Sequence, residues 1–160
     1  MNNKKNPHRV FILLLMIFLL GISGVVQAKE FVYEGEANEL TLVEWIKKAE
    51  GHVVNGEDRE ASVCYHQVLL LDEENLSANI FLGNYYYVQA EEARKVLESE
   101  YARLAKPTRM EYAKYKDSLK DLWPKYIKAS VYLKAVLTQF PSDEVMKTLK
   151  HIEELHKVIE

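Results

Sequence analysis

Histidines are the first candidates for metal or acid–base chemistry in this chain, and they are few and widely spaced. After the first 28 residues they are His52, His66, His151 and His156. His151 and His156 are five residues apart, which on a helix turns the two imidazoles roughly 140° away from each other. Neither an H-E-x-x-H motif nor a pair of cysteines occurs, so the usual zinc arrangements are absent from the sequence. We therefore expect neither a metal site nor a bound cofactor.

Nucleophilic and acid–base catalysis find little support in the sequence. Cys64 is the only cysteine, and on a helix it points to a different face from His66. The acidic residues occur in runs such as "DEEN" and "AEEAR", which are typical of solvated helix faces, whereas a glycosidase needs two carboxylates set across a cleft. We expect Cys64 to be a buried thiol at a packing position. The alternative is an exposed thiol that forms an intermolecular disulfide. We expect no enzymatic activity.

The first 28 residues have the pattern of a secretory signal peptide. Three basic residues, Lys4, Lys5 and Arg9, precede a short apolar run, and small residues end the segment at Ala28. The apolar run is interrupted by glycines and barely reaches the roughly 18 to 20 residues that a spanning helix needs. We predict export to the periplasm or cell envelope, with no stable membrane span after cleavage. Secretion beyond the envelope, and an uncleaved N-terminal anchor, are the alternatives.

The charge of the remaining chain is acidic. The whole sequence has a net charge of −3, and the first 28 residues carry three basic and no acidic side chains, so the remainder has a net charge of −6. Nucleic-acid binding depends largely on basic surfaces, so we do not expect a nucleic-acid partner.

The elements that would position any site are predicted to be helices. No glycine follows Gly83, and the tract is rich in Glu, Lys, Leu and Ala. Capping boxes are predicted at Thr41 with Glu44 and at Thr108 with Glu111. We predict an extended leader over residues 29–40 and a helical domain over residues 41–160. Its elements are a helical hairpin with a turn at Asn55-Gly56, a long helix from about Asn75 to Ala105, a return segment from Thr108 to Trp123, a helix from Lys125 to Gln139, and a terminal helix after Ser142.

The breaks between these elements are regularly spaced. Glu73, Pro107 and Pro141 lie at successive intervals of 34 residues, the period of tetratricopeptide repeats. Most of the segment 42–141 resembles that family. The residues that carry the resemblance are Trp45, Gly56, Ala61, Tyr65, Val68, Leu82, Gly83, Tyr86, Ala129, Leu133, Val136 and Pro141. The resemblance implies an all-α fold of antiparallel helical hairpins, an α-solenoid. The predicted unbroken helix through Ala90 departs from the repeat pattern, since a turn would fall there.

The run Tyr85-Tyr86-Tyr87 is the most unusual stretch of the sequence, and the resemblance suggests roles for it. In the family, Gly83 would allow close approach of a neighbouring helix and Tyr86 would fill the groove between helices. The first helices of the repeats line a concave surface that binds peptides. The matching positions here are Ile80, Asn84, Tyr87 and Val88, with Ile46, Glu50 and Val53 from the preceding unit. The alternative is that all three tyrosine rings serve the core.

The sequence therefore predicts a non-catalytic, exported module that binds a protein or peptide. A rival interpretation is a structural subunit that forms a homo-oligomer, or joins a membrane assembly, through its long helical hairpin. The surface involved would include an apolar stripe along the long helix, formed by Tyr86, Ala90, Ala93, Leu97, Tyr101 and Leu104. A third is an envelope hydrolase, for which the sequence names no catalytic residue.

Overall fold

A computed structural model describes residues 40–159 of the 160-residue chain. These residues form helices joined by short turns, and they contain no strand. The helices are α2 (Leu42–Val54), α3 (Asp58–Leu71), α4 (Leu76–Ala102), α5 (Arg109–Lys120), α6 (Trp123–Gln139) and α7 (Asp143–Ile159). The predicted all-α class is confirmed for this part of the chain, while the predicted signal peptide and nearly all of the leader lie outside the described residues. None of the helices described is long and apolar enough to cross a membrane.

The helices begin where local capping chemistry places them. The Thr41 amide donates to the Glu44 carboxylate at 2.8 Å, and the Thr41 hydroxyl accepts from the Glu44 amide at 3.4 Å. Thr108 and Glu111 form the same reciprocal pair, at 2.6 and 3.2 Å. Asn75 caps α4 by accepting from the Ala78 amide at 3.1 Å. These distances confirm both predicted capping boxes. Each box gives hydrogen-bond partners to amides that a helix start would otherwise leave unpaired.

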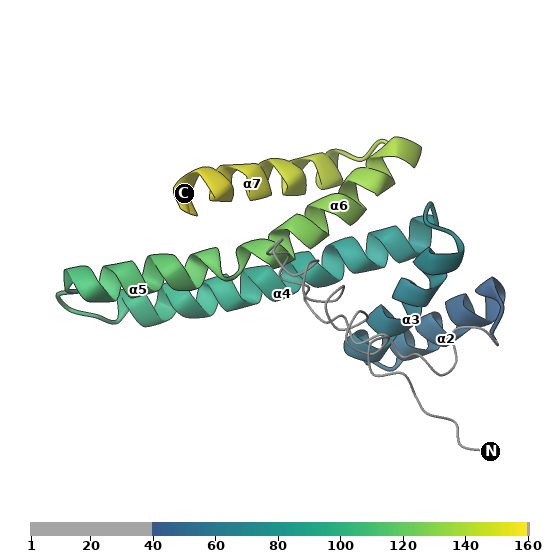
Figure 1. The fold of residues 1–160 in the computed structure, drawn as a ribbon, viewed down its shortest axis with the longest axis horizontal. Helices are drawn as coiled ribbons and strands as arrows, with labels where there is room; N and C mark the ends of the chain where they lie inside the picture. Colours follow the sequence, from purple (N-terminus) through teal and green to yellow (C-terminus); the bar gives the residue numbers. More distant parts are fainter. Residues whose placement is uncertain (1–39, 160) are drawn as a thin grey trace, which may run out of the picture. The chain divides into compact units, whose positions relative to one another are not determined.

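The long helix is continuous, as predicted. α4 runs through Ala90 without a turn, and α5 folds back along its second half (Figure 1). Three boundaries differ from the prediction. α4 ends at Ala102 rather than near Ala105, and α5 ends at Lys120 rather than at Trp123. α6 begins at Trp123 rather than at Lys125, and it contains Pro124 in its first turn. Proline is tolerated there because the first-turn amides have no partner within the helix.

Helix α4 is the central packing element of residues 40–159, with contacts to α3, α5 and α6. Gly83 lets α6 approach closely. A methyl group at that position would lie 2.7 Å from Leu133 Cδ2 and 2.9 Å from Leu133 Cγ, closer than carbon atoms pack. The predicted role of Gly83 as a close-approach residue is therefore confirmed.

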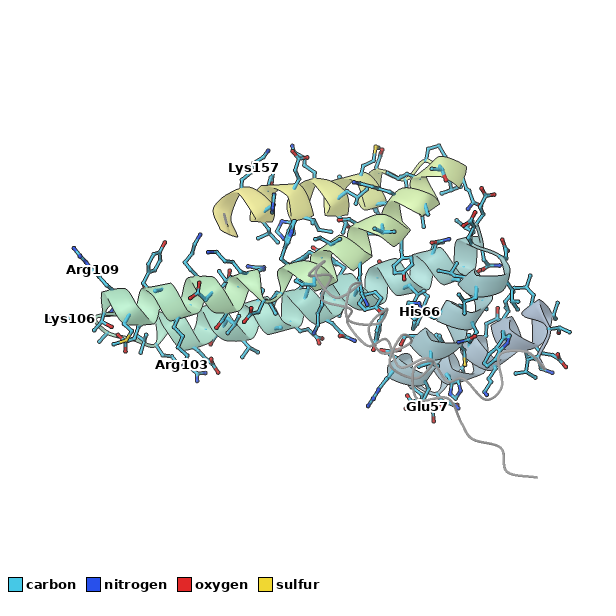
Figure 2. All side chains as sticks on the ribbon, in the orientation of Figure 1. Glu57, His66, Arg103, Lys106, Arg109 and Lys157 are labelled. Carbon is cyan, nitrogen blue, oxygen red and sulfur yellow. The ribbon has the colours of Figure 1, made fainter. Side chains whose placement is uncertain are left out.

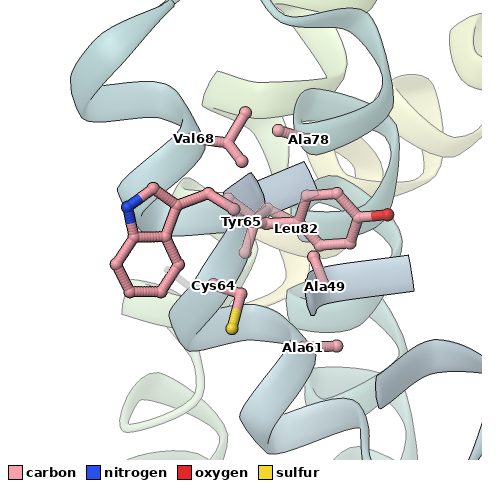
Figure 3. Packing of buried hydrophobic residues seen from close by; sticks show 8 residues of the cluster. Ala49, Ala61, Cys64, Tyr65, Val68, Ala78 and Leu82 are labelled. Atoms are coloured by element: carbon pink, nitrogen blue, oxygen red, sulfur yellow. The ribbon is translucent and has the colours of Figure 1, made fainter. Parts of the chain in front are cut away.

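The core consists of two clusters joined along α4. The first gathers residues from α2, α3 and the start of α4 (Figure 3). Its buried members are Trp45, Ala49, Ala61, Cys64, Tyr65, Val68, Ala78 and Leu82. The second contains Ala90, Tyr126, Ala129 and Ile152 from α4, α6 and α7. Cys64 is 3% exposed and unpaired with any cysteine, so its expected role as a buried packing thiol is confirmed.

Candidate functional site

An open groove of about 810 Å³ lies where the end of α2 and the start of α3 face the first half of α4. Its apolar lining consists of Val53, Tyr65, Ile80, Phe81, Tyr85 and Val88. Its polar lining consists of Asp58, Arg59, Ser77, Asn84, Gln89 and Glu92. The mixture of aliphatic and aromatic surface with single amide, hydroxyl and charged groups suits a ligand that is itself amphipathic.

Aromatic rings form one wall of the groove. The Phe81 ring lies 4.7 Å from that of Tyr65 and 5.9 Å from that of Tyr85, measured between centroids, and the Phe81 and Tyr85 rings are nearly parallel. Beside them, Ile80 is 41% exposed and Val88 is 49% exposed. Solvent-exposed aliphatic side chains next to packed rings give a ligand apolar area that is already ordered.

The residues that sequence reasoning assigned to a concave surface divide into two groups. Ile80, Asn84 and Val88 line the groove, as does Val53. Ile46 and Glu50 do not line it. Ile46 is half-buried against the first core cluster, and Glu50 is exposed on α2.

Tyr87 also does not line the groove. Its ring centroid is 6.4 Å from that of Tyr126 and 6.3 Å from that of His151, so it packs toward α6 and α7. Burial raises the pKa of its phenol. Successive helical residues are separated by about 100°, and the side of α4 that carries Tyr87 is covered by these two later helices. Of the three adjacent tyrosines, Tyr85 is the one that lines the groove.

Tyr86, the middle tyrosine, fills the space between helices. Its ring stacks on Tyr132 of α6 with centroids 6.0 Å apart, and its hydroxyl lies 3.0 Å from His66 Nε2 on α3. The predicted groove-filling role of Tyr86 is confirmed. The three adjacent tyrosines therefore have three different surroundings, namely the groove, the α3–α4–α6 junction and the second core cluster.

A polar network links α4, α6 and α7 beside the second cluster, and sequence reasoning missed it. Glu91 accepts a hydrogen bond from the Tyr126 hydroxyl at 2.6 Å and pairs with Arg94 at 2.8 Å, and it lies 3.5 Å from His151 Nε2. Arg94 also binds Glu98. The spacing of Glu91 and Arg94 permits a pair on one helix face, but the Tyr126 and His151 contacts come from distant sequence.

The electrostatics of this network are those of a structural link between helices. Burial alone would raise the pKa of Glu91. The hydrogen bonds from Arg94 and Tyr126, with the charges of Arg94 and His151, outweigh burial and lower that pKa to about 2. Burial and the neighbouring Glu91 carboxylate raise the pKa of Tyr126. Both groups thus hold their protonation state at neutral pH, whereas acid–base catalysis favours a pKa near the operating pH. In residues 40–159, no three histidine, cysteine or acidic side chains gather into a metal-binding group.

Comparison with known proteins finds a solved structure that resembles this chain. No family model matches the chain, and no curated protein matches it. The crystal structure of a protein from Bacteroides ovatus ATCC 8483, described as a "putative protein binding protein", matches with a TM-score of 0.70 and 41% sequence identity. The match covers 75% of this chain, and the chain spans 59% of the length of that protein. The fold described above is therefore shared with a solved helical protein.

Proposed function

We propose that this chain is a non-catalytic, tetratricopeptide-like module that binds a protein or peptide partner in the bacterial cell envelope. The groove beside α4 is the proposed binding surface. Export rests on the signal-like pattern of residues 1–28. The tetratricopeptide assignment rests on the 34-residue spacing, and residues of the resemblance such as Trp45, Tyr65 and Leu82 lie buried in one cluster.

The observation that carries the proposal is the exposed apolar surface of the groove. Val53, Ile80 and Val88 are 39%, 41% and 49% exposed, and they surround the ordered Phe81 and Tyr85 rings. An apolar patch bordered by polar groups on a soluble surface is typical of a protein-interaction site. The Bacteroides ovatus protein described as protein binding supports the same class of function.

The chemistry of the lining favours an amphipathic peptide or helix as the ligand. Asn84 and Gln89 can each donate and accept hydrogen bonds, so they can pair with a peptide backbone or with polar side chains. Arg59 on one side and Glu92 on the other add opposite charges that can orient the ligand. A purely apolar ligand would leave these groups without partners.

The test is affinity capture from a bacterial envelope extract with the tagged chain. Ile80→Glu places a charge inside the groove at a side chain that is already 41% exposed, so the fold should tolerate it. Val131→Glu is the matched control, because Val131 is 59% exposed on α6 and does not line the groove. We expect a specific protein to be retained by the wild type and by Val131→Glu, and its capture by Ile80→Glu to fall at least about tenfold.

Two results would contradict the proposal. If all three forms capture the same proteins equally, the groove is not the binding surface. If capture is lost for Val131→Glu as well, the interaction depends on general surface properties. Circular dichroism melting of each form verifies that the fold is unchanged.

The rival function, self-association through the α4–α5 hairpin, has a weaker basis. Leu97 is half-buried and lines the recess between α4 and α5 with Tyr101 and Tyr115, so much of the predicted stripe already packs within the hairpin. Light scattering across a range of concentrations distinguishes the two functions, because only the rival requires a stable dimer.

A further inference from the structure

The closed end of the α4–α5 hairpin is a surface that the proposed function does not use. Every residue from 102 to 114 is exposed. The lining of the groove ends at Glu92 on the same helix, and at 1.5 Å per residue the hairpin end begins about 15 Å further along α4. The two surfaces are therefore separate, and both can be occupied at the same time.

The hairpin end is basic although the chain is acidic. Residues 100–116 contain five Lys/Arg and two Glu, a local net charge of +3, while the whole chain has −3. Figure 2 shows Arg103, Lys106 and Arg109 around this end of the hairpin. In the described part of the chain, none of these three has an ion-pair partner, although such pairs occur elsewhere on α4, α5 and α7.

Helix stability does not explain all of these charges. Arg109 is the first residue of α5. The positive end of the helix dipole lies there, so an acidic residue is favoured at that position and a basic one is disfavoured. Arg103, by contrast, follows the C-terminus of α4, where a cation is favourable. The arginine at 109 therefore does not contribute to the stability of α5, and its charge is available for an interaction.

Large apolar side chains accompany the cations. Met110 is 80% exposed, Tyr112 is 52% exposed and Leu104 is 38% exposed. Met110 is adjacent to Arg109 in sequence, and Leu104 is adjacent to Arg103. Apolar and tyrosyl side chains next to cations are characteristic of elements that enter the headgroup region of a bilayer.

We infer that the end of the α4–α5 hairpin docks on the surface of an anionic phospholipid bilayer. Arg103, Lys106 and Arg109 meet the lipid phosphates, while Met110 and Leu104 enter the boundary of the acyl chains. Charge complementarity selects the anionic surface. A bilayer fits better than a peptide because the cations and apolar groups cover an exposed hairpin end, whereas peptide recognition uses a groove such as the one beside α4.

The test measures whether the hairpin end contacts lipid, by the fluorescence of a label attached there. Ala105→Cys in the full chain places a thiol in the exposed connection, and an environment-sensitive fluorophore attached there reports contact with lipid. Cys64 is buried, so it does not compete for the label. The matched control is Lys147→Cys, which is exposed on α7. Vesicles of phosphatidylcholine, with and without phosphatidylglycerol, are then added.

We expect a blue shift at position 105 with phosphatidylglycerol vesicles only, and no shift at position 147. Each cation near an anionic surface strengthens binding about fivefold, so Arg103→Glu with Arg109→Glu should weaken the response at least about 25-fold. Glutamate suits the first position of α5, so Arg109→Glu should not harm that helix. Met110→Ser should weaken the response several-fold while every charge remains.

Three results would overturn the inference. The fluorescence of the label at 105 could stay unchanged with every vesicle, which would exclude docking on a bilayer. Capture of an acidic protein by the hairpin end would then assign this surface to a protein partner. The same label could respond equally to both lipid compositions, which would remove the role of charge. The label at 147 could shift as much as that at 105, which would mean that another part of the chain brings the whole molecule to the bilayer.

Discussion

At the scale of single residues, Glu91 is an acidic side chain that lies mostly out of solvent. Its side chain is 12% exposed, and it holds the Tyr126 hydroxyl and the Arg94 guanidinium together beside α7. A carboxylate in such a position stabilises the fold only while it is ionised. The network therefore predicts a defined acid sensitivity.

Glu91→Gln should lower the free energy of unfolding at neutral pH by roughly 2 kcal/mol, because a charged hydrogen-bond acceptor is lost. The pKa of Glu91 is lowered from 4.5 to about 2 in the folded state. Its contribution is thus fully present above about pH 4.5 and is lost as the pH falls toward 2. Urea unfolding at a series of pH values measures the difference between wild type and variant, which should shrink over this range.

The exposed neighbour Glu92 provides the control for this prediction. Glu92→Gln should change the unfolding free energy by less than about 0.5 kcal/mol at every pH. A difference between wild type and Glu91→Gln that stays constant down to acid pH would contradict the proposed electrostatic role.

At the scale of elements, the approach of α6 to α4 depends on Gly83. Leu133 is 2% exposed, so it has little room to move away from an added methyl group. Gly83→Ala should destabilise the fold by about 1 to 2 kcal/mol, because steric crowding exceeds the gain in helix propensity. Thermal or urea unfolding measures this change.

Gly51 supplies a contrasting case within α2. A methyl group there would meet no atom within 4 Å. Gly51→Ala should therefore stabilise the fold by roughly 0.5 to 1 kcal/mol, since only the propensity and chain-entropy terms remain. If both substitutions stabilise the fold, the contact between α4 and α6 is looser than its geometry indicates.

At the scale of the whole described unit, α4 connects the two core clusters. Leu82 belongs to the first cluster and Ala90 to the second, and both lie on this one helix. Tyr86, between them in sequence, packs against both. The clusters should therefore unfold together, since neither can lose α4 without exposing the other.

The two tryptophans of the chain make this testable. Trp45 lies in the first cluster and Trp123 packs against the second. Trp123→Phe leaves Trp45 as the only tryptophan, so the fluorescence reports on the first cluster. Trp45→Phe leaves Trp123, so the fluorescence reports on the second cluster. No described group accepts a hydrogen bond from the Trp45 indole nitrogen, so Trp45→Phe removes no such contact there. In each variant, urea transitions followed by tryptophan fluorescence and by circular dichroism should coincide. An earlier fluorescence transition at Trp45 would mean that the first cluster unfolds independently.

Much of this architecture is predictable from sequence because its causes are local. Thr41 and Thr108 cap helices through residues three positions away. The glycine-free tract through Ala90 predicts one continuous helix. The buried positions of the first cluster follow from helical periodicity. Ile80, Asn84 and Val88 could likewise be assigned to one helix face, which the structure places in the groove.

The remaining features depend on contacts between distant parts of the chain. Tyr85 and Tyr87 are two residues apart on the same helix, and local sequence offers no reason for one to line the groove and the other to pack toward α6 and α7. The difference arises because Tyr87 meets Tyr126 and His151, which follow it by 39 and 64 residues. Glu91 pairs locally with Arg94, but its contacts to α6 and α7 come from the same two distant side chains. Sequence by itself determined the capped starts of α2, α4 and α5, the continuity of α4 and which helix faces are apolar. Only tertiary packing decided which apolar face is covered and which stays open, because that depends on where α6 and α7 come to lie.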